Sequence, residues 1–268
     1  MKIFQTPKKS LGQNFLIDKN IINKIVKVGN IDSDKVVMEI GPGYGNLTEV
    51  IHKMKPKKIF AIEKDKKLFF FLKDKFKNQK NVSIINADIL NIIRRKNLKK
   101  NIIIFGNLPY NISTQILASL IMVEKWPPWY EMLIFMFQEE VADRIMSNIR
   151  TKELNRLCVL ANWRLEIKKH FNITKNCFFP RPKVNSTLLS FKPKKNIQFY
   201  IKNPKNLEKI TRVLFSNKRK MINKNFEKLF GKNSFVAKNL NIDLKKRPEN
   251  LSIEMYYKIA REYEKLFG

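Results

Sequence analysis

A glycine-rich loop between a buried strand and a helix is the feature that most constrains this fold. Val36-Val37-Met38-Glu39-Ile40 is a short apolar run typical of a buried strand, and Gly41-Pro42-Gly43-Tyr44-Gly45 follows it directly. A helical pattern then runs from Asn46 to His52. Glycines at such a junction let the backbone approach a ligand closely, as in nucleotide-binding loops. The pattern therefore predicts an α/β fold whose ligand lies where this strand ends.

Acidic residues end the next two predicted strands. The run Lys58–Ile62 leads into Glu63, and the run Val82–Ile85 is followed closely by Asp88. Glu63 lies about as far beyond the glycine loop as the acid that binds ribose hydroxyls in dinucleotide folds. Together, the loop and the two acids predict a pocket for an adenosine. Asp88 alone has a second interpretation, because exposed acids at strand ends commonly cap helices.

The glycine spacing argues against two other nucleotide-binding loops. It is Gly-x-Gly-x-Gly rather than the Gly-x-Gly-x-x-Gly of dinucleotide enzymes, and the chain has no Gly-x-x-x-x-Gly-Lys-Ser/Thr phosphate loop. A nicotinamide-dependent dehydrogenase is therefore a weak hypothesis, and the chain offers no obvious acid for hydride transfer.

The following strand, Ile102–Ile104, ends in Asn107-Leu108-Pro109-Tyr110. Pro109 fixes its own φ and keeps Leu108 extended, so the Leu108 carbonyl stays out of a regular hydrogen-bond ladder. This carbonyl and the Asn107 side-chain oxygen are two acceptors that suit an exocyclic amino group. Tyr110 can stack on a base. The alternative is an ordinary turn between a strand and a helix.

A second aromatic segment lies between two predicted strands, 163–170 and 186–191. In Phe178-Phe179-Pro180-Arg181-Pro182-Lys183-Val184, two adjacent aromatic residues precede two prolines, with basic residues between and after them. This segment is a candidate for the second wall of a base pocket. Apolar residues packed beneath a proline-rich loop would give the same pattern.

The charge of the chain indicates a polyanionic partner. Its 268 residues carry 54 Lys and Arg against 23 Asp and Glu, a formal charge of +31.

We expect no membrane association, because no lipidation signal or apolar run of about 20 residues occurs, and the basic N-terminus lacks the apolar core of a signal peptide. Two Cys and two His are too few and scattered for a zinc site or a histidine-dependent mechanism, so we expect no metal and buried thiols in a reducing cytosol.

Four motifs in order carry a family resemblance. They are Leu11-Gly12-Gln13-Asn14-Phe15-Leu16, the segment 39–48 around the glycine loop, Asn107–Thr114, and Phe179–Ser186. With these motifs the chain resembles the S-adenosylmethionine-dependent rRNA adenine N6,N6-dimethyltransferases over essentially its whole length, most closely the type that acts on the small ribosomal subunit. The resemblance implies a Rossmann-like class I methyltransferase domain (residues 1–192) with a seven-stranded, mostly parallel sheet, followed by a small, basic, helical domain (residues 193–268).

The resemblance also implies roles for residues at matching positions. The cofactor-binding residues would be Asn14, Leu16, Gly41, Gly43, Glu63, Asp88 and Asn107. Asn14 and Leu16 would close over the methionine part of S-adenosylmethionine, Gly41 would lie beneath it, Glu63 would bind the ribose, and Asp88 the adenine amino group.

The implied catalytic residues are Asn107, Leu108, Pro109, Tyr110 and Phe179. Asn107 would lie between the cofactor and the target base. Tyr110 and either Phe178 or Phe179 would hold the flipped adenine between them, and Phe179 matches better because it directly precedes Pro180.

The chain departs from the family at three places. Asn185 replaces the usual Asp, Arg181 replaces a frequent Pro, and Leu154-Asn155 replaces a commoner Tyr-Gly pair. These changes affect the loops expected to face RNA and leave the methyl-transfer residues intact.

The C-terminal part has helical apolar periodicity over 206–215, 221–230, 235–240 and 252–266. Ser216-Asn217-Lys218-Arg219-Lys220 is a basic cluster at a helix junction and a reasonable contact for the rRNA backbone, although such clusters are often only solvated. The family resemblance implies a cytoplasmic monomer that modifies two adjacent adenosines near the 3′ end of 16S rRNA in the small subunit. The alternatives are a 23S rRNA methyltransferase of the macrolide-resistance type and a non-catalytic RNA-binding assembly factor.

Overall fold

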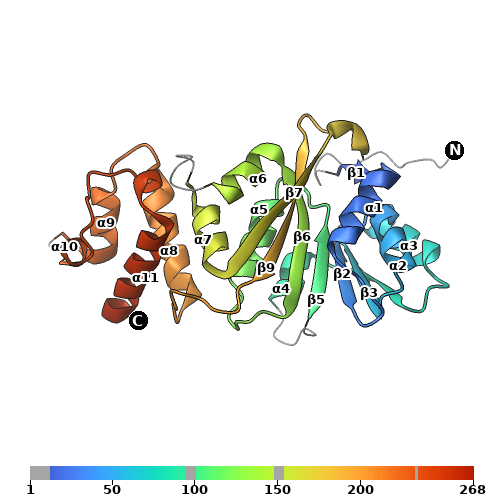
Figure 1. Cartoon of the computed structure of the whole chain (residues 1–268), viewed down its shortest axis with the longest axis horizontal. Helices are drawn as coiled ribbons and strands as arrows, with labels where there is room; N and C mark the ends of the chain where they lie inside the picture. The colour runs from blue at the N-terminus through green and yellow to red at the C-terminus, as the bar shows by residue number, and fades with distance from the viewer. Residues whose placement is uncertain (1–12, 95–100, 148–153, 233–234) are drawn as a thin grey trace. The chain divides into compact units, whose positions relative to one another are not determined.

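The computed structural model describes residues 13–94, 101–147, 154–232 and 235–268, so Leu11 and Gly12 of the first motif lie outside the described residues. By its internal contacts the chain divides into two compact units (Figure 1). The first comprises residues 1–119, 127–142 and 167–193, and the second residues 120–126, 143–166 and 194–268.

A seven-stranded sheet is the centre of the first unit. Its strands are β2 (Val36–Ile40), β3 (Lys58–Glu63), β4 (Val82–Asn86), β5 (Ile102–Gly106), β6 (Tyr130–Gln138), β7 (Leu165–Ile173) and β9 (Ser186–Pro193). They lie in the order β4-β3-β2-β5-β6-β9-β7. The pairs from β4 to β6 are parallel and β9 is antiparallel to β6. The prediction of a seven-stranded, mostly parallel sheet is confirmed.

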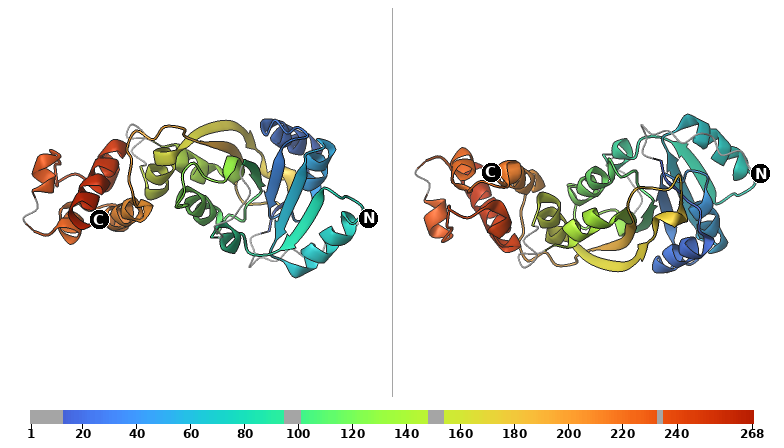
Figure 2. Two further views of the ribbon diagram at one scale, coloured as in Figure 1. Left: turned by 90° about the horizontal axis from the view of Figure 1, so that it is seen from below. Right: turned by 90° about the horizontal axis from the view of Figure 1, so that it is seen from above.

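Helices cover both faces of this sheet (Figure 2). In chain order they are α1 (Lys19–Val28), α2 (Asn46–Lys53), α3 (Lys66–Lys75), α4 (Ile89–Ile93), α5 (Ser113–Ile121) and α6 (Glu139–Met146). Residues of α1 and α2, including Ile22, Ile25 and Ile51, join Val37 and Phe105 of the sheet in one buried core. Alternation along each strand places these sheet residues on one face, so burial of apolar side chains holds α1 and α2 against that face.

A second, two-stranded sheet was not predicted from the sequence. It pairs β1 (Phe15–Leu16) with β8 (Phe178–Phe179) in antiparallel register, Phe15 opposite Phe179 and Leu16 opposite Phe178. The Ile17 amide extends the pairing by donating to the Cys177 carbonyl over 2.8 Å. Two strands of two residues each leave no periodic pattern, because the pairing depends on segments far apart in the chain.

Helices make up most of the second unit. They are α7 (Arg156–Arg164), α8 (Pro204–Leu214), α9 (Asn223–Phe230), α10 (Val236–Asn239) and α11 (Ile253–Phe267). Short 3-10 turns accompany them in the C-terminal part at Phe215–Asn217 and Pro248–Asn250. The four helices predicted in the C-terminal part are confirmed.

The predicted strand over 163–170 was wrong at its start. Trp163 and Arg164 belong to the end of α7, and β7 begins at Leu165. Tertiary contacts explain the longer helix: the Arg164 guanidinium lies 4.0 Å from the Trp163 ring centroid and 4.7 Å from that of Trp126. It also donates to the Ile121 carbonyl over 2.9 Å. The contacts of this buried cation with two aromatic rings stabilise the end of the helix, although the aromatic residue itself suggested a strand.

Among the described residues, no helix is both long and apolar enough to cross a bilayer. That same part of the chain contains no group of three or more His, Cys, Asp or Glu placed to hold a metal ion. Cys158 and Cys177 are buried free thiols.

Candidate active site

A pocket opens at the carboxyl ends of β2 to β5. Ile40 is paired with Ile62 on β3 and with Gly106 on β5. This register places Gly41, Glu63 and Asn107 side by side. Each of these residues lies at the end of its strand or directly after it. The predicted residues that line the pocket are Asn14, Gly41, Gly43, Glu63, Asp88, Asn107, Leu108, Pro109 and Tyr110.

The Glu63 carboxylate fixes the glycine loop. One oxygen accepts the Gly43 amide at 3.2 Å and the other accepts the Asp65 amide at 2.8 Å. Burial raises the pKa of Glu63, while these backbone bonds oppose the shift. Each carboxylate oxygen can accept a further hydrogen bond, so Glu63 can bind two adjacent hydroxyls of a ribose.

Asp88 combines the two roles considered for it. Its side chain caps α4 by accepting the Leu90 amide at 2.9 Å, and it also lines the pocket. Its other oxygen accepts from the Lys64 ammonium at 2.8 Å, and this bond holds the pKa of Asp88 below its usual range. The carboxylate is therefore ionised at neutral pH and can accept from an amino group of a ligand.

The Asn107 amide is oriented by the N-terminal arm, the segment Gln13–Leu16. Its nitrogen donates to the Asn14 carbonyl over 2.7 Å. With the nitrogen committed to this bond, the side-chain oxygen faces away from Asn14 and remains an acceptor. A backbone carbonyl 93 residues distant in sequence thus sets the direction of the acceptor that the motif supplies.

The arm also contacts the glycine loop and the first residue of α2. The Phe15 ring packs on Gly43 so closely that a β-carbon there would lie 2.6 Å from a ring carbon, and it meets Tyr44 edge to face at 4.6 Å. The Leu16 carbonyl accepts from the Asn46 side chain at 2.8 Å. Leu16 does not line the pocket. Its carbonyl instead anchors the arm through the bond to Asn46.

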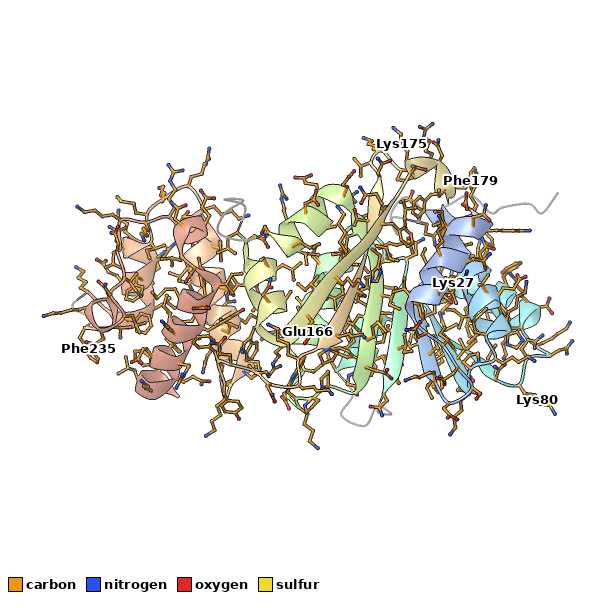
Figure 3. The ribbon with its side chains drawn as sticks, viewed as in Figure 1. Lys27, Lys80, Glu166, Lys175, Phe179 and Phe235 are labelled. Atoms are coloured by element: carbon orange, nitrogen blue, oxygen red, sulfur yellow. The ribbon has the colours of Figure 1, made fainter. Side chains whose placement is uncertain are left out.

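The two aromatic residues predicted to hold the base differ in position. Tyr110 lines the pocket, and its hydroxyl lies 2.7 Å from the Ser186 hydroxyl. Phe179 lies outside the lining residues, on the same end of the first unit as Lys175 (Figure 3). Phe179 is 44% exposed, whereas Phe178 is 3% exposed. The Phe178 ring is therefore part of the core, whereas Phe179 is exposed.

Sequence reasoning missed Glu39, a buried carboxyl in β2 immediately before the glycine loop. Its oxygen accepts from the Thr48 hydroxyl of α2 at 2.6 Å. Burial raises the pKa of Glu39 to about 7, and the charge of Glu63 contributes to this shift. Its place inside an apolar strand run could have indicated a buried carboxyl. A buried carboxyl needs a polar partner, so a hydrogen bond to this residue could have been expected.

We expect Glu39→Gln to make stability less dependent on pH. A carboxyl with a pKa of 4.5 unfolded and about 7 folded favours the folded state below about 4.5, and this contribution is lost as the pH rises through 7. The loss is about 3 kcal/mol. The glutamine variant should therefore gain stability relative to wild type between pH 4.5 and 8 in urea unfolding. Glu166→Gln, at an exposed carboxylate, is the control, and parallel wild-type and Glu39→Gln curves would contradict the prediction.

Two departures from the family are accommodated locally. The Asn185 side-chain oxygen accepts the Lys175 amide at 3.1 Å, a bond that an aspartate would also make. Asn155 begins α7 by accepting the Cys158 amide at 3.1 Å, and its nitrogen donates to the Arg144 carbonyl at 2.7 Å. Both asparagines therefore act as turn and cap residues.

Two solved structures of methyltransferases share this architecture. A dimethyladenosine transferase from Plasmodium falciparum superposes with a TM-score of 0.77 at 25% identity, covering 94% of this chain and 98% of that one. The 23S rRNA methyltransferase ErmE superposes with a TM-score of 0.68 at 19% identity, covering 93% of this chain and 99% of ErmE. The sheet order and the pocket at its strand ends thus define a class I methyltransferase.

Sequence comparison extends the similarity across the chain. Residues 4–265 match the family described as ribosomal RNA adenine dimethylase, and the chain belongs to this family. The ribosomal RNA small subunit methyltransferase A of Pelagibacter ubique is 48% identical over 266 residues, 99% of this chain and 100% of the relative. The ribosomal RNA small subunit methyltransferase A of Nitrobacter winogradskyi is 36% identical over 265 residues, which cover 97% of this chain and 91% of the relative. The protein is therefore an enzyme that methylates adenines of ribosomal RNA.

Proposed function

We propose that the protein transfers methyl groups from S-adenosylmethionine to N6 of two adjacent adenosines near the 3′ end of 16S rRNA, within the small ribosomal subunit. The product is N6,N6-dimethyladenosine. The observation that carries the chemistry is the Asn107 amide, anchored through its nitrogen to the Asn14 carbonyl at 2.7 Å in a pocket that Glu63 and Asp88 also line. The relatives named for the small subunit support the choice of substrate.

The cofactor end of the pocket fits an adenosine. Glu63 would accept the ribose hydroxyls and Asp88 the adenine amino group, while Gly41 and Gly43 leave room for the backbone to approach. Both glycines have positive φ, +68° and +58°. S-adenosylmethionine supplies a methyl group already activated on a positively charged sulfur, so the protein chiefly positions the acceptor.

The base end of the pocket positions the target nitrogen. Asn107 and the Leu108 carbonyl would accept the hydrogens of the adenine amino group and so localise its lone pair. As the N–C bond forms, the nitrogen gains positive charge that these fixed dipoles stabilise. The proton then becomes acidic enough to leave to water, so a strong base is unnecessary. Stacking between Tyr110 and Phe179 would offset the cost of extracting the base, a few kcal/mol.

The basic cluster Lys218-Arg219-Lys220 would bind the rRNA backbone. All three residues are exposed beside the 3-10 turn Phe215–Asn217. We expect their replacement by Glu to weaken binding to small subunits. The slope of log affinity against log salt should become shallower by about one for each phosphate group that the variant no longer neutralises. Binding measured at several salt concentrations tests this expectation.

Lys53, Lys55 and Lys57 provide a charge-matched control, because they are exposed at the amino edge of the sheet, opposite the pocket. Their replacement by Glu changes the net charge equally. Equal slopes of log affinity against log salt for both triple variants would show that the cluster acts only through the overall charge of the protein.

The remaining expectations follow from this substrate. A small-subunit enzyme would act in the cytoplasm as a monomer on an assembling subunit. The boundary near residue 192 between a methyltransferase domain and a basic helical domain also belongs to this proposal. A 23S rRNA substrate is the second candidate, since the fold is shared with a 23S rRNA methyltransferase.

Methyl transfer from labelled S-adenosylmethionine into unmethylated small subunits tests the proposal, with large subunits and duplex DNA as controls. Label recovered as N6,N6-dimethyladenosine from small subunits alone is the expected result. Label only in large subunits would assign the chain to the macrolide-resistance activity. Cofactor binding without transfer to any RNA would indicate a non-catalytic assembly factor.

A further inference from the structure

Ser186 is a buried hydroxyl at the edge of the site that takes no direct part in methyl transfer. It is the first residue of β9 and is inaccessible to solvent. Its oxygen lies 2.7 Å from the Tyr110 hydroxyl. This bond joins the Asn107–Tyr110 segment directly to the end of the segment that begins at Phe179.

Tyr110 is held both through its backbone and at the tip of its side chain. The Ser113 hydroxyl donates to the Tyr110 carbonyl at 3.2 Å, and the Ser113 amide donates to the Pro109 carbonyl at 3.0 Å. These bonds fix the backbone, whereas the bond to Ser186 fixes the far tip of the ring. A tyrosine with a fixed backbone and a fixed hydroxyl has little freedom left at either side-chain torsion.

We propose that Ser186 is a positioning residue that sets the ring plane of Tyr110, and that the second methyl transfer depends on it more than the first. The inference rests on the proposed function. It assigns to the Ser186 hydroxyl a role in determining whether the product is the monomethylated or the dimethylated base.

The reason lies in the hydrogens of the target nitrogen. Unmethylated adenine offers two N–H groups, which Asn107 and the Leu108 carbonyl can both accept. After the first transfer only one N–H remains, so only one of these two acceptors still holds the nitrogen. Stacking on Tyr110 then carries a larger share of the alignment, and a looser ring misaligns the nitrogen more in the second reaction than in the first.

The test compares Ser186→Ala with Ser190→Ala. Ser190 is also a buried serine of β9, and its hydroxyl lies 2.8 Å from His170 Nε2; neither residue lines the pocket. Both variants lose one buried hydroxyl bond of the same strand. Single-turnover methylation of small subunits, with nucleoside analysis over time, gives the rates of the first and second transfers separately.

For Ser186→Ala we expect the second rate to fall about three- to tenfold relative to the first, the range that one neutral hydrogen bond covers. Affinities for S-adenosylmethionine and for the subunit should stay within about twofold, because neither binds through this hydroxyl. Ser190→Ala should leave the ratio of the two rates unchanged. Loss of folded enzyme lowers both rates equally, so the ratio separates positioning from stability.

Tyr110→Phe provides a second route to the same bond. It keeps the ring and removes the hydroxyl, so it should change the ratio in the same direction, and the double variant with Ser186→Ala should be no worse than the more affected single variant. Equal ratios in wild type and Ser186→Ala, or equal changes in Ser186→Ala and Ser190→Ala, would overturn the proposal. Absence of methyl transfer by the wild type would instead refute the proposed function.

Discussion

Asn107→Ala is expected to lower the rate of methyl transfer about a hundred- to a thousandfold, the cost typical of removing one preorganised polar group from a transition state. Affinity for S-adenosylmethionine should fall by no more than about fivefold, since the variant loses one neutral hydrogen bond of the arm. Transfer into small subunits and titration of the cofactor measure the two effects separately.

The size of the effect follows from the position of the amide. The Asn107 nitrogen bonds the Asn14 carbonyl at 2.7 Å, so its oxygen is oriented before any substrate arrives. A dipole already oriented requires no reorganisation when the target nitrogen becomes positive. An alanine leaves only the Leu108 carbonyl, and the amino group can then rotate away from the line of attack.

Asn91→Ala is the matched control, because Asn91 is an exposed asparagine of α4 and not a pocket residue. It should leave both transfer and cofactor affinity unchanged. Retained transfer by Asn107→Ala would remove Asn107 from the centre of the mechanism. A parallel fall in transfer and cofactor affinity would make it a binding residue only.

Gly43→Ala is expected to weaken S-adenosylmethionine binding at least about thirtyfold, roughly 2 kcal/mol, by forcing Phe15 away from the glycine loop. A β-carbon at Gly43 would lie 2.6 and 2.8 Å from two Phe15 ring carbons, and the φ of +58° adds backbone strain. Phe15 lies between Asn14 and Leu16, so its displacement disturbs the carbonyl that orients Asn107. Cofactor titration and urea unfolding measure the consequences.

Gly231→Ala is the control that separates the effect of backbone strain from the effect of the steric clash with Phe15. Gly231 also has positive φ, +84°, but a β-carbon there meets no atom within 4 Å. Its ψ of 169° adds to this a conformation essentially restricted to glycine, so the variant should lose about 1 to 3 kcal/mol of stability through backbone strain alone, with cofactor affinity unchanged. Equal effects of the two variants on cofactor binding would show that packing of the arm on the loop is unimportant.

Much of the fold was predictable because it depends on local pattern. β2 was predicted from a short apolar run, the helices of the C-terminal part from apolar periodicity, and the glycine loop from its composition. Glu63, Asp88 and Asn107 were identified as site candidates because parallel strands that end together bring their next residues together. Their expected roles in binding stay predictions.

The remaining errors have tertiary causes. Trp163 and Arg164 were expected in a strand, but α7 extends through them, and the buried Arg164 guanidinium contacts two tryptophan rings there. Glu39 was interpreted only as part of an apolar strand, and its bond to Thr48 could not be deduced without knowing how α2 packs.

Local sequence patterns define the class of fold, the strand ends that form the pocket and the residue types that line it, because each depends on short apolar runs and on conformations that glycine and proline permit. The orientation of those residues depends instead on tertiary contacts. The pairing of β1 with β8, the bond from Asn107 to Asn14 and the bond from Tyr110 to Ser186 join segments far apart in the chain. Such contacts depend on the packing of the whole sheet, so no local pattern records them.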